Sequence, residues 1–258
     1  MEVTQLLLYV LAGAGVGFAV GVTGVGGGSL MTPLLLMFGF PPHIAVGTDL
    51  LYASITKAGG AFAHHRQGHV DWTIARRLAI GSLPAALLTI AVLHTFFTDP
   101  TAYAGLIKGM LGVMLILTAG VLLFKKRLLG LISPESFIVR HAAPLTVLSG
   151  IVLGVCVTLS SVGAGAFGAA VLIMLFPLLS TARIVGTDIA HAVPLTLVAG
   201  LGHLWLGNVD FLLLGALLVG SLPAISLGAR LTRHMPSGLL QGLLTTLLLG
   251  LGIRYAFF

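Results

Sequence analysis

The chain alternates between long apolar segments and short polar or glycine-rich breaks. Most of the apolar segments are long enough for the roughly 20 residues that a helix needs to cross a bilayer. The pattern therefore predicts an all-α polytopic membrane protein. Ten segments are recognised, at 6–22, 30–40, 44–62, 78–93, 106–124, 142–159, 166–179, 184–206, 211–227 and 239–253.

Two of these segments, 30–40 and 166–179, are too short to span a bilayer. Each follows a glycine-rich break, at 24–28 and 163–168 respectively. Short hydrophobic segments interrupted by glycine at corresponding places are typical of discontinuous helices in transporters. We therefore expect broken or re-entrant helices at both breaks.

The composition agrees with a protein whose main solvent is lipid. Of the 258 residues, 57% are apolar and 8% are charged, with a mean hydropathy of +1.11. No stretch has the composition of a soluble catalytic module, so we expect a single membrane domain over 1–258. The N-terminus lacks the basic region of a cleavable signal peptide, and we expect 6–22 to stay in the mature protein.

The chain also repeats itself with an offset of 139 residues. Val-Gly-Thr-Asp at 46–49 recurs at 185–188, and Gly-Ser-Leu-Pro-Ala at 81–85 recurs at 220–224. A single register kept over this length indicates two homologous halves of about five segments each. The halves are 1–124 and 142–258, joined by a basic linker at 125–141.

The basic residues predict how the halves are oriented. The net charge is +6, but Lys and Arg lie at the ends of apolar segments rather than in a stripe with aromatic residues, so membrane topology explains them better than nucleic acid does. If each half crosses the membrane an odd number of times, ten basic residues gather on the cytoplasmic side and two on the other. This predicts inverted halves with both termini outside. The ten are Arg66, Arg76, Arg77, Lys125, Lys126, Arg127, Arg140, Arg183, Arg230 and Arg233, and the two are Lys108 and Arg254.

The glycine breaks are candidate anion sites. Unpaired backbone N–H groups at a helix N-terminus, together with the helix dipole, attract anions without a basic side chain. The alternative is that these glycines only allow close helix packing. The candidate substrate-binding residues are Gly24, Gly26, Gly27, Gly28 and Ser29 in the first half, and Ser161, Gly163 and Gly165 in the second.

Among the ionisable residues inside apolar segments, the candidates for function are Asp49, Lys57, Asp188 and His191. Charges within a membrane are costly and normally face a cavity or a partner. Lys57 is therefore a candidate substrate-binding residue, and the other three are candidates for coupling to protons or for gating. The alternatives are helix caps for the aspartates, snorkelling to an interface for Lys57, and a packed core position for His191.

A metal site is the weaker interpretation of the remaining histidines. His64, His65 and His69 stand near Asp71, but no HExxH motif accompanies them, and the single cysteine, Cys156, lies in an apolar segment. Interface anchoring by Trp, His and Arg explains this cluster. We expect no metal and no cofactor.

The motifs together resemble the sulfite exporter TauE/SafE family, also called the toluene sulfonate uptake permease family. They are the run Gly-Val-x-Gly-Val-Gly-Gly-Gly-Ser-Leu-x-x-Pro at 21–33, the Val-Gly-Thr-Asp pair, a Gly-x-Val-Asp after a helix end at 68–71 and 207–210, and the Gly-Ser-Leu-Pro-Ala pair. The resemblance covers nearly the whole chain. One departure is Phe167, which replaces a glycine in the second break.

The resemblance implies a transporter in the bacterial inner membrane that carries sulfite, thiosulfate, sulfoacetate or a related organosulfonate. Its partners would be this small sulfur anion, membrane lipid and protons, and not nucleic acid. Two alternatives differ in class: an anion channel, and a membrane-embedded enzyme that uses Asp49 and Asp188 as a pair. The sequence lacks the GxGD and HExxH motifs of such enzymes, so we expect no enzyme activity.

Overall fold

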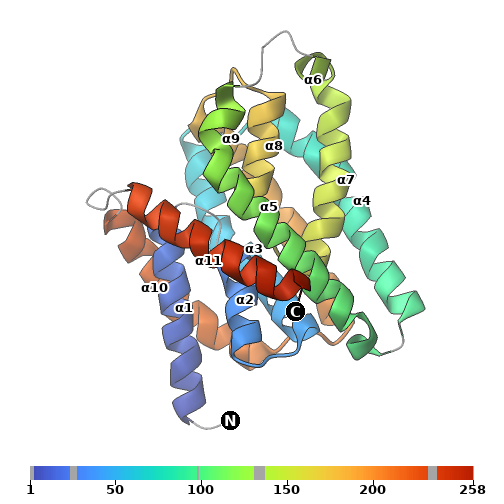
Figure 1. The fold of residues 1–258 in the computed structure, drawn as a ribbon, viewed down its shortest axis with the longest axis vertical. Helices are drawn as coiled ribbons and strands as arrows, with labels where there is room; N and C mark the ends of the chain where they lie inside the picture. The colour runs from blue at the N-terminus through green and yellow to red at the C-terminus, as the bar shows by residue number, and fades with distance from the viewer. Residues whose placement is uncertain (1–2, 24–27, 98, 131–136, 232–236, 258) are drawn as a thin grey trace.

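The computed structural model describes residues 3–23, 28–97, 99–130, 137–231 and 237–257, and every regular element within them is helical (Figure 1). The elements are α1 (Val3–Thr23), α2 (Gly28–Met37), α3 (Pro42–Arg66), α4 (Trp72–Phe96), η1 (Pro100–Tyr103), α5 (Ala104–Gly130), α6 (Phe137–Arg140), α7 (Ala142–Ser160), α8 (Ala166–Leu175), α9 (Thr181–Trp205), α10 (Phe211–Leu231) and α11 (Ser237–Phe257).

Six stretches of the described residues are long and apolar enough to cross a membrane, and they lie in α1, α4, α5, α7, α9 and α10. The all-helical, multi-pass architecture predicted from the sequence is thereby confirmed. Helix α3 is as long as α9 but is not one of the six, because it carries Asp49, Lys57 and a polar end. Helices α2 and α8 have 10 residues each and follow the two glycine breaks, as the pattern predicts.

The start of α4 shows why helices begin where they do. Asp71 caps α4, because its Oδ1 accepts the N–H groups of Thr73 and Ile74 at 3.1 and 3.2 Å. Gly68, just before it, has a φ of 71°, a left-handed conformation that glycine adopts without strain. Gly207 occupies the equivalent turn after α9 with a φ of 77°.

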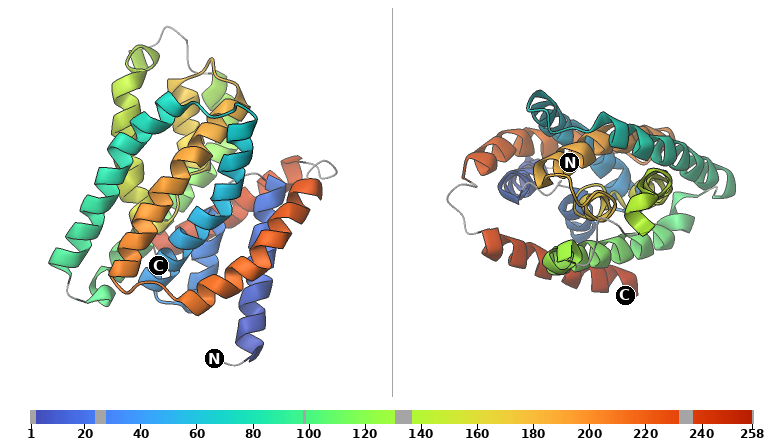
Figure 2. Two further views of the ribbon diagram at one scale, coloured as in Figure 1. Left: turned by 180° about the vertical axis from the view of Figure 1, so that it is seen from behind. Right: turned by 90° about the horizontal axis from the view of Figure 1, so that it is seen from above.

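Each main packing contact joins one helix of the first half to one of the second. Helix α1 packs on α10, α4 on α7, α3 on α9 and α5 on α11. Helices α3 and α9 lie side by side near the middle of the molecule (Figures 1 and 2). Under the repeat, α1 corresponds to α7 and α4 to α10. The pairs α1–α10 and α4–α7 therefore exchange with each other, while α3–α9 and α5–α11 each map onto themselves.

Glycine contacts show this equivalence residue by residue. Each of the glycines concerned leaves no room for a side chain, because the backbone of the facing helix lies against it. An offset of 137 residues relates α1 to α7 and one of 139 relates α4 to α10. The matched contacts are Gly13–Leu217 with Gly150–Leu78, Gly17–Ser221 with Gly154–Ser82, and Gly220–Val10 with Gly81–Val147.

Two threonine hydroxyls, one in α3 and one in α9, show the same equivalence between the halves. Thr48 Oγ1 in α3 accepts the N–H of Asp210 at 3.1 Å, and Thr187 Oγ1 in α9 accepts the N–H of Asp71 at 2.9 Å. Both pairs differ by the same 139 residues. Each central helix is therefore tied to the start of the fourth helix of the opposite half.

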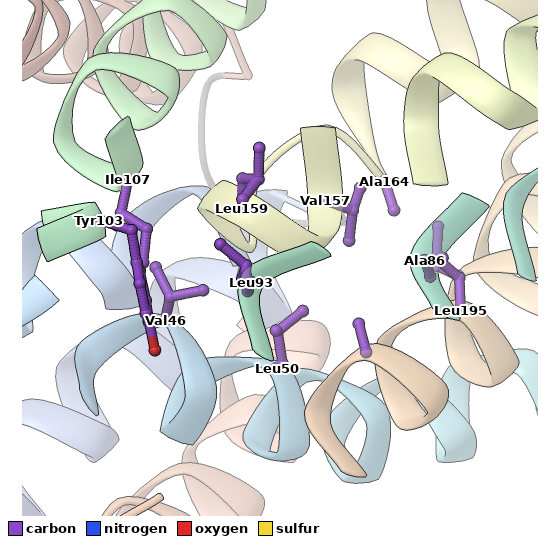
Figure 3. Packing of buried hydrophobic residues seen from close by; sticks show 12 residues of the cluster. Val46, Leu50, Ala86, Leu93, Tyr103, Ile107, Val157, Leu159, Ala164 and Leu195 are labelled. Atoms are coloured by element: carbon purple, nitrogen blue, oxygen red, sulfur yellow. The ribbon is translucent and has the colours of Figure 1, made fainter. Parts of the chain in front are cut away.

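The largest apolar cluster lies where α3, α4, α7 and α9 meet, with η1 and α5 beside them (Figure 3). Val46 and Leu50 of α3 pack there with Leu195 of α9 and with Ala164, which belongs to the second glycine break. Burial of these side chains holds the break against the two central helices.

The connection between the halves is partly helical. The sequence predicts a basic linker at 125–141, whereas α5 continues to Gly130 and Phe137–Arg140 form the short helix α6.

Candidate functional site

Helices α3 and α9 pack side by side and carry four ionisable side chains in the interior. Asp49 is 0% exposed, Asp188 and His191 are 1% exposed, and Lys57 is 6% exposed. Asp49 and Asp188 occupy equivalent positions in the two halves. The four residues that the sequence singles out for their cost in a membrane therefore share the core of the molecule.

Asp49 lies against the short helix of its own half, beside Thr32, the fifth residue of α2. Its Oδ2 accepts the backbone N–H of Thr32 in α2 at 3.1 Å, and it also accepts the Thr32 hydroxyl. Since α3 begins at Pro42, Asp49 is inside α3 and does not cap that helix. The buried Ser161 hydroxyl also lies close enough to interact with this carboxyl.

Asp188 lies at the start of α8, the short helix of the other half. The backbone N–H of Gly165, the residue before α8, faces its carboxyl. Its Oδ1 stands where a side chain on Gly168 would have to be. Asp188 thus occupies the N-terminal end of α8, where the helix dipole favours negative charge, whereas Asp49 lies against the middle of α2.

Lys57 joins α3 to the second glycine break. Its Nζ donates a hydrogen bond of 3.1 Å to the carbonyl oxygen of Ala164. The ammonium attracts both aspartates, Asp188 more strongly than Asp49, although it forms a direct salt bridge with neither. At 6% exposure Lys57 does not snorkel to an interface. The two halves differ here, because the position equivalent to Lys57 is the neutral Thr196.

His191 is bonded to the first half through α4. Its Nε2 lies 2.8 Å from the Ser82 hydroxyl oxygen. The equivalent pair in the other half is Tyr52 and Ser221, where the Tyr52 hydroxyl faces Ser221 but has no hydrogen-bond partner among the described residues. The site is therefore symmetric in its aspartates and asymmetric in its basic groups.

The second glycine break has an unusual backbone. Ser161 ends α7 with a φ of 57°, and Gly163 and Gly165 have φ values of 129° and 136°. These are conformations that residues with side chains rarely adopt, and they turn the chain from α7 into α8. In this break the Ala164 carbonyl faces Lys57 and the Gly165 N–H faces Asp188. Substrate binding by Ser161, Gly163 and Gly165 stays a prediction.

The first break is described only in part. Gly24, Gly26 and Gly27 lie outside the described residues, while Gly28 and Ser29 are the first two residues of α2. The sequence predicts an anion site between the first break and Lys57, closed by the second break. Within the described residues the one hydrogen bond of Lys57 goes to the second break.

Several buried polar atoms near the packed helices α3 and α9 have no hydrogen-bond partner among the described residues. They are Asp49 Oδ1, Asp188 Oδ1, Ser161 Oγ, Tyr52 Oη and His191 Nδ1. A buried polar group without a partner costs about 1–3 kcal/mol, so native proteins keep such groups mainly where they serve a function. Across all the residues that the structure describes, no group of three or more His, Cys, Asp or Glu side chains has an arrangement that could hold a metal ion.

Three contributors to the site are not among the predicted site residues. Thr32 donates a hydrogen bond to Asp49, Ser82 is hydrogen-bonded to His191, and the Ala164 carbonyl accepts a hydrogen bond from Lys57. Ser82 carries a sequence signal, since its motif recurs at Ser221 in the other half. A backbone carbonyl gives no such signal, because every residue has one.

Comparisons with known proteins agree with this architecture. The family model described as "Sulfite exporter TauE/SafE" matches residues 9–255. The chain is 40% identical over 248 residues to the probable membrane transporter protein YjnA of Bacillus subtilis (strain 168), covering 95% of this chain and 97% of that protein. It is 30% identical over 230 residues to the probable membrane transporter protein YdhB of the same organism, covering 87% and 89%.

A more distant relative is a probable membrane transporter protein of Haemophilus influenzae, 28% identical over 173 residues and covering 64% of this chain and 61% of that protein. No solved structure gives a significant match. The family model spans nearly the whole chain, and the first two relatives are matched over most of their length. The chain therefore belongs to the sulfite exporter TauE/SafE family of membrane transporters.

Proposed function

We propose that the protein is a secondary transporter of a small sulfur-containing anion in the bacterial inner membrane. Sulfite, thiosulfate, sulfoacetate and related organosulfonates form this class. The observation that carries the proposal is the buried ammonium of Lys57, held at a helix break between the two halves.

An oxyanion that leaves water must receive hydrogen bonds and positive charge from the protein. The Lys57 ammonium has three N–H donors, and the described residues accept from one of them, at the Ala164 carbonyl. The Ser161 hydroxyl is buried and unpaired among the same residues. Together with the backbone N–H groups at the start of α8, these donors match the tetrahedral oxygens of a sulfur oxyanion.

The arrangement of the helices supports alternating access by two inverted halves. The exchange of packing partners between halves is what a two-fold axis relating them produces. The salt bridge of 3.2 Å between Asp71 and Arg183 holds the starts of α4 and α9 together, so Arg76 and Arg183 lie at one end of the bundle. A shared basic end favours an odd number of crossings per half, a cytoplasmic basic end and both termini outside.

Coupling to protons is the second part of the proposal. Carboxyl groups inside a membrane mark proton and ion pathways in transporters. Asp49 and Asp188 are buried on facing helices, and each has one oxygen without a partner among the described residues. His191 lies close to the same ammonium and is the third candidate.

Uptake into proteoliposomes tests the function. Purified protein should accumulate at least one of sulfite, thiosulfate and sulfoacetate, and an imposed pH gradient should drive uptake against the anion gradient. Flux that only ever follows the anion's own gradient would instead indicate a channel. Failure of every sulfur anion, with uptake of another solute, would overturn the substrate class.

A further inference from the structure

We propose that Asp188 takes up a proton each time the substrate anion binds at Lys57, so that anion and proton travel together. The inference rests on the proposed function and deepens it, because it names the proton acceptor and the direction of coupling. It follows from the count of charges in the site and from the different surroundings of the two aspartates.

The site has more negative than positive groups. Asp49 and Asp188 contribute two carboxylates, and Lys57 contributes one ammonium, so the three groups sum to −1 when all are ionised. His191, the next titratable group, holds Ser82 of α4 through one ring nitrogen. A further anion next to Lys57 would leave two uncompensated negative charges in the interior. Buried charges without compensation are strongly unfavourable, so a proton must enter with the anion.

The surroundings decide which carboxylate receives that proton. Asp49 is supported as an anion by two hydrogen bonds from Thr32 of α2. Each aspartate has one carboxyl oxygen without a partner among the described residues. Asp188 accepts no side-chain hydrogen bond among them, and its main electrostatic support is Lys57. The remaining support is the N–H of Gly165 at the start of α8.

An anion at Lys57 therefore competes with Asp188 for the same ammonium. When the anion takes the positive charge, Asp188 loses its counter-ion, while Asp49 keeps its hydrogen bonds to Thr32. Asp188 becomes protonated, and the loaded site carries less net charge than it would otherwise. The linkage requires affinity for the anion to rise as pH falls, by about tenfold per pH unit for one linked proton.

Calorimetric titration with methanesulfonate and with thiosulfate tests the inference, because neither anion itself titrates near neutral pH. Each titration is run in two buffers that differ in ionisation enthalpy, so that the difference in heat gives the number of protons bound. For the wild-type protein we expect an uptake of about one proton per methanesulfonate bound. For Asp188→Asn we expect binding without proton uptake and an affinity that no longer depends on pH.

Two variants serve as matched comparisons. Asp49→Asn should keep the proton uptake, since its carboxyl is not the acceptor. Asp99→Asn should also keep it: Asp99 is exposed in the loop before η1, where the backbone N–H of Thr101 lowers the pKa of its carboxyl and keeps it ionised.

Proton release or no proton change in the wild type would overturn the inference while leaving anion transport intact. Persistent uptake in Asp188→Asn, or its loss in Asp49→Asn or in a His191→Gln variant, would show that another group is the acceptor. If neither anion nor any other sulfur oxyanion binds, the proposed function fails and the inference with it. Infrared difference spectra give a test that does not require the Asp188→Asn variant to fold. Anion binding should produce a protonated-carboxyl band in both the wild type and Asp49→Asn.

Discussion

Ser82 Oγ in α4 lies 2.8 Å from His191 Nε2 in α9, and this hydrogen bond ties the first half to the buried polar cluster of the second. The other ring nitrogen of His191 has no partner among the described residues. The equivalent residues Ser221 and Tyr52 make no such bond.

Removing this bond should therefore cost more than the equivalent change in the other half. Ser82→Ala leaves a buried imidazole unsatisfied, and we expect a loss of about 1–3 kcal/mol in unfolding free energy. Ser221→Ala removes no bond to Tyr52 and should cost less. Thermal unfolding of the two purified variants in the same detergent measures the difference, and equal losses would argue against a structural role for the bond.

Lys57 should set the strength of anion binding. Lys57→Ala removes a charged hydrogen-bond donor worth about 1.5–3 kcal/mol, so the dissociation constant should rise by about 10- to 100-fold. Lys57→Arg keeps the charge and should bind more weakly than wild type but better than Lys57→Ala. Titration of sulfur oxyanions into the three proteins gives the comparison. Unchanged affinity in Lys57→Ala would place the site elsewhere.

Gly168 should be important for proton-driven uptake, because the Asp188 carboxyl occupies the space that a side chain at this position would need. Gly168→Ala forces this carboxyl to move, and a displaced coupling group should slow proton-driven uptake by about tenfold or more. Gly59→Ala is the control, because Gly59 in α3 has open space around it. Initial rates in proteoliposomes should separate the two variants. Normal rates in Gly168→Ala would mean that the carboxyl tolerates displacement.

The close contacts of α4 and α10 predict matched stability effects. Gly81 lies against Val147 of α7, and Gly220 lies against Val10 of α1, each at the backbone. Gly81→Val and Gly220→Val should each lower the unfolding free energy by about 1–3 kcal/mol through overpacking. Gly215→Val, at a position with open space, gives the reference cost of a β-branched side chain in α10. Denaturation midpoints would show whether the two contacts are equivalent.

The topology can be tested with reporters in living cells. Fusions after Gly68 and Gly207 fall at equivalent turns, which inverted halves place on opposite sides of the membrane. A reporter active only in the cytoplasm should work after Gly68 and fail after Gly207, and a periplasmic reporter should do the reverse. The same result at both sites would exclude inverted halves.

The sequence by itself determined the helical, multi-pass fold and the two short helices, and it predicts the division into two halves. Those features depend on local properties, namely the length of apolar segments, the glycine breaks and repeated motifs such as 46–49 and 185–188. It also pointed to Asp49, Lys57, Asp188 and His191, because ionisable residues in apolar segments stand out without knowledge of their neighbours.

Only the tertiary structure decided how these residues are paired. Lys57 bonds to the Ala164 carbonyl, 107 positions away in the chain, and Ser82 bonds to His191 across 109. Asp49 was open to interpretation as a cap of its own helix, and the structure instead places it against Thr32 of α2. Such contacts depend on which helix faces meet and at what register, and the hydrophobic pattern leaves this open because nearly every face of these helices is apolar.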